Sequence, residues 1–369
     1  MSTVYLLSYI IKEFKAEYSP VARLRELMYR AGIRDVISDG DTVAIKTHFG
    51  SPGGFRIVRP IFLKKIVEIV KELGGKPFVT DTCRPPALDY LEIANAEGIN
   101  HLSVGAPVII ADGLKGNDYR LVKINGEVMK EVEVASTIYE ADAMIVVSHA
   151  KGHRMAGFGG ALKNLAMGCT AKPGKRRIHN VLGGEPPVWR EEKCTRCGAC
   201  VSACDHKAIA LVDGKIVIDE EKCVRCYRCV WVCPNRALVW DKRGVERFLK
   251  AIAEAAAAVV STFKEGKILY LNFVCDVTVA CDCTPWSTNP LVPDIGIFAS
   301  KDSVAIDTAS LDLINKSEGI PGQTLPGKVE VLPANINKFL EVHGIDPYIQ
   351  VHHGEKIGLG STKYEIIEI

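Results

Sequence analysis

The fold class is decided by the stretch TVAIKTHFGSPGGFRIVRPIFLKKIVEIVKELGGKPFVTDT, residues 42–82. Its first part, TVAIKTHF (42–49), is apolar and predicts a buried strand, and KPFVTDT (76–82) predicts another. Between them, RPIFLKKIVEIVKELGG (59–75) has the apolar spacing of an amphipathic helix, with Pro60 in its first turn and two glycines at its end. This order of elements predicts two parallel strands joined by a right-handed crossover.

Strands and helices alternate in the same way on both sides of a cysteine-rich block. The further elements that we expect are strands at 143–149, 267–277 and 294–300, helices at 244–260 and 301–317, and a hairpin with an Asn-Gly turn at 122–134. The alternation predicts an α/β fold built on a mainly parallel sheet.

The cysteine-rich block is expected to be an insertion in this sheet domain. The segment GGEPPVWREE (183–192), rich in glycine and proline, marks the boundary. We therefore assign residues 1–187 and 241–369 to one discontinuous α/β domain, completed by the last fifty residues, and 188–240 to a small α+β module.

Composition indicates a globular protein that handles metal or electrons. The 369 residues are 47% hydrophobic and 24% charged, and 46 Lys and Arg against 44 Asp and Glu leave a net charge of +2. This balance gives no reason to expect nucleic acid or an anionic membrane as a partner.

No apolar run is long enough to span a bilayer and the amino terminus lacks the features of a signal peptide, so we expect a cytoplasmic location. Thirteen cysteines in that compartment favour metal or redox chemistry over disulfides.

The cysteines of the block form an internal duplication. The first repeat, KCTRCGACVSACDHKAI (193–209), has the spacing C-x2-C-x2-C-x3-C at Cys194, Cys197, Cys200 and Cys204. The second, KCVRCYRCVWVCPNRAL (222–238), has the same spacing at Cys223, Cys226, Cys229 and Cys233, each 29 residues after its counterpart. The first three cysteines of a repeat can wrap around one cubane cluster and bind three of its iron atoms. The fourth cysteine lies on the following helical turn and points elsewhere.

Residues 190–240 resemble the bacterial two-[4Fe–4S] ferredoxin family. The resemblance implies one cluster on Cys194, Cys197, Cys200 and Cys233, and a second on Cys223, Cys226, Cys229 and Cys204. Asp205 departs from the family, which often has proline there, whereas Pro234 keeps it. Zinc is the alternative ligand, but zinc sites usually pair C-x2-C knuckles across a longer gap. Between the repeats, ALVDGKIVID (210–219) predicts two short strands around an Asp-Gly turn.

Polar residues gather where the predicted strands end. Lys46 and His48 follow the first strand, and Asp81, Cys83 and Arg84 follow the next. The segment SHAKGHRMAGFGGALKNLAMGC (148–169) follows the third strand and contains His149, Lys151, His153, Lys163, Asn164 and Cys169. Because the carboxyl ends of parallel strands line the ligand crevice of an open sheet, we expect a shared site there. Helix-start amides near residue 160 would cradle an anion beside Lys163.

Two further segments allow more than one interpretation. The run KPGKRRIHN (172–180) is either a solvated basic loop or a clamp in which Arg176 and its neighbours meet an acidic substrate or partner. In VCDVTVACDCTPW (274–286), Cys275, Cys281 and Cys283 bind a further metal or cluster, with Cys169, Cys83 or a histidine as fourth ligand. Alternatively, Cys275 is a buried strand residue and the other two are redox-active or simply reduced.

The chain outside the cysteine block resembles the DUF362 family of uncharacterised iron–sulfur centre proteins. The resemblance rests on KTH (46–48), residues 148–168, CDC (281–283) and GIFASKDSVAIDTASLDLI (296–314). It implies an α/β domain in a redox setting, and it favours Lys46, His48, His149, Lys151, His153, Lys163, Asn164, Cys281, Cys283 and Asp307 as site residues. Asp307 is equally well explained as a polar helix residue or as a partner of a helix amino terminus.

These features lead to one functional hypothesis with two alternatives. We expect an oxidoreductase in which two clusters pass electrons to the α/β domain, where Lys163 and Arg176 hold an anionic substrate and His149 or His153 moves protons. Lys46, His48 and Asn164 would also contact that substrate, Lys151 would assist the chemistry, and a redox partner protein would supply electrons. The alternatives are an electron carrier without its own catalysis, and a metal- or cofactor-handling protein.

Overall fold

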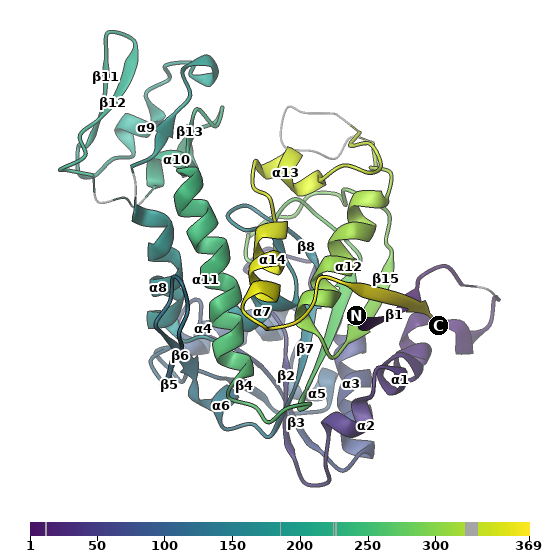
Figure 1. Cartoon of the computed structure of the whole chain (residues 1–369). Coiled ribbons are helices and arrows are strands. Elements are labelled where there is room, and N and C mark those ends of the chain that lie inside the picture. Colours follow the sequence, from purple (N-terminus) through teal and green to yellow (C-terminus); the bar gives the residue numbers. More distant parts are fainter. Residues whose placement is uncertain (12, 185, 224, 226, 322–330) are drawn as a thin grey trace.

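The protein is described from a computed structural model that covers residues 1–11, 13–184, 186–223, 225, 227–321 and 331–369. An eight-stranded sheet runs through its centre (Figure 1). In spatial order the strands are β16 (Tyr364–Glu368), β1 (Ser2–Ser8), β15 (Gly296–Ser300), β14 (Ile268–Val274), β7 (Ala143–His149), β2 (Thr42–Lys46), β3 (Lys76–Asp81) and β4 (Val108–Ile110).

The sheet is mainly parallel, as the sequence predicts. Neighbouring strands from β14 to β4 all pair in parallel, as do β1 and β16, whereas β15 is antiparallel to both of its neighbours. No helix lies between β14 and β15, so the chain returns directly, and such a return gives an antiparallel pair. The predicted fold class is confirmed.

Helices cover both faces of the sheet, which explains why its strands are almost continuously apolar. One face is covered by α1 (Pro20–Arg30), α2 (Ile33–Val36), α3 (Pro60–Glu72), α4 (Ala87–Ala96) and α5 (His101–Val104). The other is covered by α6 (Ser136–Tyr139), α7 (Ala161–Gly168), α8 (Lys172–Asn180), α11 (Lys242–Val260), α12 (Ser303–Lys316), α13 (Lys338–His343) and α14 (Tyr348–Lys356). In β7, Met144 and Val146 pack on the second face while Ile145 and Val147 pack on the first.

The cysteine-rich insert projects beside the upper end of α11 (Figure 1). Its elements are β10 (Val188–Trp189), α9 (Ala199–Ser202), β11 (Ile209–Val212), β12 (Lys215–Ile218), α10 (Arg228–Val232) and β13 (Leu238–Val239). β10 pairs with β13 where the insert begins and ends, and β11 and β12 form the predicted hairpin around Asp213 and Gly214. Short 3-10 turns lie at Ala16–Tyr18, Val181–Gly184 and Glu191–Lys193.

Two local predictions need correction. The run 172–180 is the helix α8 and not a loop, with Pro173 in its first turn. The hairpin predicted at 122–134 pairs β5 (Tyr119–Lys123) with β6 (Glu131–Ala135), so its Asn-Gly pair lies inside a longer connection. The carboxylate of Glu254 in α11 accepts the backbone N–H groups of 127–129 and replaces the hydrogen bonds of a tight turn.

No helix in the described part of the chain is long and apolar enough to cross a membrane.

Candidate functional site

A cavity of about 510 Å³ opens at the carboxyl ends of β2, β3 and β7. From β2 the chain proceeds to β3 and β4 on one side, and β7 then pairs with β2 on the other side. Ligands of open α/β sheets bind at such a switch in strand order, because the loops diverge there and leave a crevice. The cavity therefore lies where the sheet topology predicts a binding site.

A buried ion pair lies at the base of the cavity. The Lys46 ammonium, at the end of β2, is 2.9 Å from Asp81 Oδ1, at the end of β3, and both side chains are at most 3% exposed. The other carboxylate oxygen of Asp81 lies 2.9 Å from His48 Nδ1 and accepts the Tyr90 hydroxyl at 2.5 Å. Burial alone would raise the pKa of Asp81, but Lys46 and His48 hold that pKa well below its usual range.

The ring of His48 is oriented toward the cavity by this carboxylate. Because a carboxylate only accepts, His48 Nδ1 carries the proton, and Nε2 is left as an acceptor. His48 Nε2 has no partner in the described structure although it is buried. An imidazole held by a carboxylate in this way is equipped to accept a proton from a bound molecule.

Asn164 of α7 fixes the Lys46 side chain from the opposite side. Its Oδ1 accepts the Lys46 ammonium at 2.7 Å, and its Nδ2 donates to the carbonyl of Val147 at 3.0 Å. Gly168, one turn further along α7, leaves the space that the Lys46 ammonium fills, because a Cβ at residue 168 would collide with it. Lys46 is therefore held between two strands and a helix.

Lys163, also on α7, is a cation of the cavity without a protein partner. It has neither a hydrogen bond nor an ion pair among the described residues. Burial, and then the nearby charges of Lys46 and Arg84, lower its pKa to about 8. Five Lys and Arg side chains but two Asp side chains line the cavity. The excess of positive charge makes it suited to an anion.

The amides at the start of α7 are already occupied, which corrects the expected anion cradle. Asp307 of α12 accepts the N–H of Ala161 at 2.7 Å and of Leu162 at 2.9 Å, and Asn272 donates to it at 2.8 Å. Gly160 permits this approach, since a Cβ there would overlap the carboxylate. Asp307 is the partner of a helix amino terminus, and it satisfies the donors that would otherwise hold a ligand.

A second buried ionic cluster, of Asp282, His149 and Lys151, forms part of the cavity wall. Asp282 is bonded to His149 Nδ1 at 2.9 Å and to the Lys151 ammonium. The other nitrogen of His149 lies 2.7 Å from the carbonyl of Cys275, so both ring nitrogens face acceptors. Burial alone would raise the pKa of Asp282, but Lys151 and His149 lower it well below its usual range. His149 and Lys151 thus fix the loop that follows β14.

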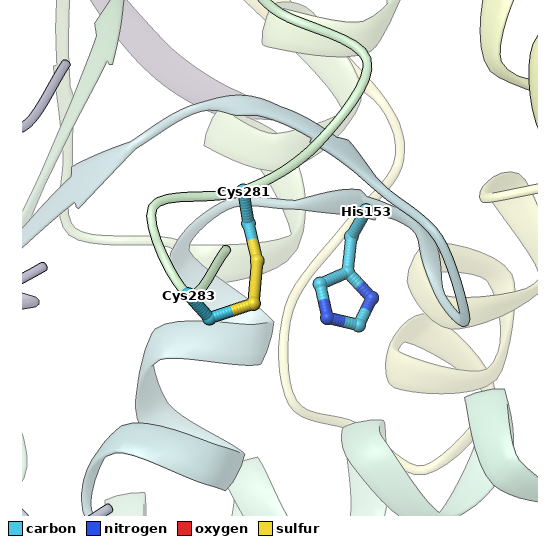
Figure 2. A group of neighbouring side chains, drawn as sticks. All are labelled: His153, Cys281 and Cys283. Carbon is cyan, nitrogen blue, oxygen red and sulfur yellow. A yellow bond between two sulfur atoms is a disulfide. The ribbon is translucent and has the colours of Figure 1, made fainter. Parts of the chain in front are cut away.

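Beyond Asp282, Cys281 and Cys283 face the cavity and are joined by a disulfide, with His153 beside them (Figure 2). The ligand atoms of these three residues lie within 4.8 Å of one another, an arrangement that could hold a metal ion. Cys275 is buried on the other side of β14, and neither Cys83 nor Cys169 lines the cavity. The structure therefore does not bring Cys275, Cys83 or Cys169 to the pair Cys281 and Cys283, as a metal site with three or four cysteine ligands would require.

In a comparison with known families, the family described as "Domain of unknown function (DUF362)" matches residues 43–312. The chain belongs to the DUF362 family. No curated protein matches it.

Two solved structures match this DUF362 protein with low sequence identity and low TM-scores. One is the lactate racemase apoprotein from Thermoanaerobacterium thermosaccharolyticum, with 15% identity, a TM-score of 0.41, and coverage of 81% of this chain and 56% of that one. The other is a structural genomics target from Thermotoga maritima, with 12% identity, a TM-score of 0.39, and coverage of 72% and 52%. The chain thus spans little more than half the length of either protein.

In this DUF362 protein the duplicated cysteines are arranged with matching backbone geometry. Residues with positive φ recur 29 positions apart at Arg196 and Arg225, at Gly198 and Tyr227, and at Lys207 and Arg236. Ala208 N–H donates to Cys204 Sγ at 3.3 Å, and Ala237 N–H donates to Cys233 Sγ at 3.1 Å. The duplication found in the sequence is therefore also a duplication of structure.

Four of the insert cysteines surround one small cavity. They are Cys194, Cys197 and Cys200 from the first repeat and Cys233 from the second. Of the other four, Cys226 lies outside the described residues, while Cys204 and Cys223 are half-buried and Cys229 is buried. Together with the family, this cysteine content fits an iron–sulfur protein.

The insert also contributes to the wall of the large cavity. Trp231, which lies between Cys229 and Cys233, lines that cavity, and its ring stacks with the Arg154 guanidinium at 4.7 Å. The Tyr227 hydroxyl donates to the carbonyl of Leu182 at 2.8 Å, and Arg236 donates to that of Val342 at 2.7 Å. Side chains of the insert thus contact both a ligand cavity and the domain that forms it.

Most of the predicted site residues meet in the cavity. Those that line it are Lys46, His48, His149, His153, Lys163, Asn164, Cys281 and Cys283. Arg176 does not, because it lies on the exposed face of α8. Lys175 and His179 line the cavity instead, and the 3.6-residue period of a helix would have placed these two on one face. Tyr90 and Trp231, which also line it, carry no signal in the sequence.

Proposed function

We propose that this protein is an iron–sulfur redox protein in which two [4Fe–4S] clusters in the insert exchange electrons with a small anionic substrate in the cationic cavity. Cys194, Cys197, Cys200 and Cys233 would hold one cluster, and Cys223, Cys226, Cys229 and Cys204 the other. The cavity formed by the first set supports this ligand assignment, because three thiols of one repeat meet the fourth thiol of the other. The amides that donate to Cys204 and Cys233 suit thiolate ligands, whose charge they stabilise.

The observation that carries the proposal is the position of Trp231. It lies in α10 between two cysteines of the insert, and it lines the cavity of the sheet domain. A cluster held by the cysteines that flank Trp231 would lie on the side of the insert that faces the cavity, and so on the same side of the molecule as the substrate. This position matters because electron transfer slows steeply with distance.

An anionic substrate is favoured by the charges of the cavity. Lys163 has no hydrogen-bond or ion-pair partner in the part of the chain that the structure describes, and Lys175 and Arg84 add to the positive potential around it. When bound, the clusters supply single electrons; the residues of the chain bind the substrate and handle protons. Lys163 would hold the anion, while His48 Nε2, held in place by Asp81, would accept or return a proton.

This assignment revises the expected proton carrier. His149 was one candidate, but both of its nitrogens bond to protein acceptors. His48 lines the cavity; its Nδ1 bonds to the Asp81 carboxylate, and its buried Nε2 has no partner among the described residues. An electron carrier without its own chemistry is less well supported, because such a protein needs a surface for docking its partners but has no need of a cavity of about 510 Å³.

The test of the clusters is the metal content of protein purified without oxygen. We expect about eight irons per chain, a broad absorbance near 400 nm that bleaches on reduction, and a spin-resonance signal in the reduced protein. Zinc in place of iron would remove the redox proposal and leave only the sheet domain with its cavity.

The test of the substrate class compares Lys163→Ala with Arg176→Ala. Trp231 and Trp286 both line the cavity, so tryptophan fluorescence reports on the binding of small carboxylates and inorganic phosphate. We expect Lys163→Ala to weaken binding about tenfold or more, since hydrogen bonds to charged groups contribute about 1.5–3 kcal/mol. Arg176→Ala removes an exposed charge of the same sign and should leave affinity and iron content unchanged.

The pH dependence gives an independent check on Lys163. Because its pKa is lowered to about 8, the free cavity loses this positive charge as pH rises through that value. Anion affinity should therefore fall above about pH 8, and Lys163→Arg should retain it to higher pH because arginine stays protonated. Equal affinity of all variants at every pH would remove Lys163 from the site.

A further inference from the structure

The cysteines outside the insert fall into two classes. Cys83, Cys169 and Cys275 are buried, none lines the cavity, and burial raises the thiol pKa of each to about 12. Cys281 and Cys283 are half-buried, line the cavity and form a disulfide (Figure 2). Thiol reactivity requires access and a stabilised thiolate, so the first class is inert and the second is open to chemistry.

The loop 281–283 places both cysteines in the lining of the cavity. Asp282, between the two cysteines, is turned into the protein, where His149 and Lys151 bind its carboxylate. The carbonyl of Cys283 accepts a hydrogen bond from Arg84. These contacts hold the backbone between the two cysteines and at Cys283 whether or not the two sulfur atoms are bonded to each other.

His153 supplies a hydrogen-bond donor beside the pair. Its Nδ1 accepts the backbone N–H groups of Ala156 at 3.0 Å and Met155 at 3.3 Å, so its lone pair is engaged. The proton of the neutral ring then lies on Nε2, which faces the disulfide (Figure 2). An N–H in this position stabilises a thiolate, whereas a metal ligand needs a free nitrogen lone pair. The hydrogen bonds therefore favour thiol redox chemistry over metal binding.

We propose that Cys281 and Cys283 form a redox-active disulfide that is reduced by two electrons to a dithiol inside the cavity. On reduction the S–S bond breaks, two electrons enter, and cavity water supplies the protons for the resulting thiolates. That the electrons come one at a time from iron–sulfur clusters of the insert rests on the proposed function. In reverse, the dithiol gives two electrons to a substrate bound beside it, releases its two protons and re-forms the S–S bond. The pair would thus collect single electrons from the clusters and deliver two electrons together to the substrate.

The experiment is an anaerobic dithionite titration of the full chain, followed by alkylation and peptide mass spectrometry. With two clusters and the disulfide, the wild-type protein should take up about four electrons per chain, and a Cys281→Ser/Cys283→Ser variant about two. Cys275→Ser is the matched control, because it removes a buried thiol and should still take up about four. Alkylation should label Cys281 and Cys283 only after reduction, and iron content should be equal in all three proteins.

The outcomes separate this inference from the proposed function. Equal electron uptake by the wild-type protein and the double variant, with iron present, overturns the redox pair. So does a stoichiometric metal that only the double variant loses. If the protein contains no iron, the proposed function fails, and the pair is judged by alkylation after phosphine reduction. Labelling of Cys281 and Cys283 only after that treatment upholds the redox pair, and labelling before it overturns it.

Discussion

The insert and the sheet domain are stabilised in different ways. The sheet domain has an extensive apolar cluster on each face of its sheet, whereas the insert has seven buried residues in its own cluster, and two of these are cysteines. Six described residues of the insert other than glycine have positive φ, against two in the rest of the described chain. Such conformations cost free energy and persist only where something else holds them.

The difference indicates what each region needs in order to fold. Burial of apolar surface is enough to stabilise a domain of the size of the sheet domain, while fewer than about 60 residues usually need a disulfide, a metal or a partner. The cysteines of the insert are grouped where iron–sulfur clusters would supply the missing stabilisation. Three predictions test this contrast, beginning with the largest effect.

Removal of iron should unfold the insert and leave the sheet domain folded. Cluster binding would contribute the folding free energy of residues 188–240, because their apolar cluster is too small to do so. In hydrogen exchange, an iron-chelated sample or a Cys200→Ser variant should lose protection throughout 188–240 and keep it in β2, β3 and β7. Cys169→Ser, which changes a buried thiol of the sheet domain, is the control and should keep protection in both the insert and the sheet domain.

Protection of the insert that survives complete loss of iron would contradict this contrast. The insert would then be stable through its own hairpin and its contacts with the sheet domain, such as the bond from Tyr227 to Leu182. Loss of protection in β2 and β7 as well would mean that the two regions fold as one unit.

The sheet domain should instead be sensitive to its buried ion pair. Asp81→Ala leaves the Lys46 ammonium buried without its carboxylate, which typically costs about 3–5 kcal/mol. Chemical denaturation should show this loss for the sheet domain, with iron content unchanged. Asp205→Ala removes an exposed carboxylate of the insert and should have little effect on the sheet domain.

The pH dependence of the same pair has a definite sign. Because the pKa of Asp81 is lowered in the folded protein, its stabilisation is present above its unfolded pKa of about 3.9 and is lost as pH falls further. The difference in stability between the wild-type protein and Asp81→Ala should therefore shrink below about pH 4. If the difference in stability between the two proteins were the same at all pH values, the ion pair would not be the cause of that difference.

The fold could be predicted from sequence because its signals are local and periodic. The apolar runs of β2, β3 and β7 and the amphipathic pattern of α3 give the α/β class directly. The division into a sheet domain and a cysteine-rich insert at 188–240 stays a prediction. The helix α8 was missed because four basic residues suggest a solvated loop. The helix buries Gly174 and Ile178, four residues apart, against the rest of the sheet domain. The sequence does not reveal this contact.

The site could be predicted only where polar residues follow strands. Lys46, His48 and His149 were found in this way. Tyr90 and Trp231 reach the cavity from a helix of the first face and from the insert, and only the tertiary arrangement brings them there. The role of Asp307 depended on a contact between α12 and α7, two helices separated in the sequence by the whole insert.

The smallest of the three effects concerns that helix contact. Asp307→Ala removes the acceptor for two amides of α7 and for Asn272, and we expect a loss of about 2 kcal/mol in the stability of the sheet domain. Asp307→Asn should lose less than Asp307→Ala because it keeps one acceptor oxygen, but it should still be less stable than the wild-type protein because its NH2 group cannot accept from the second backbone donor. Iron content and hydrogen exchange of the insert should be the same in both variants, because the contact lies wholly within the sheet domain. If Asp307→Ala instead lowered iron content while leaving the unfolding midpoint unchanged, α7 would couple the cavity to the insert, and the separate stabilisation of the two regions would be wrong.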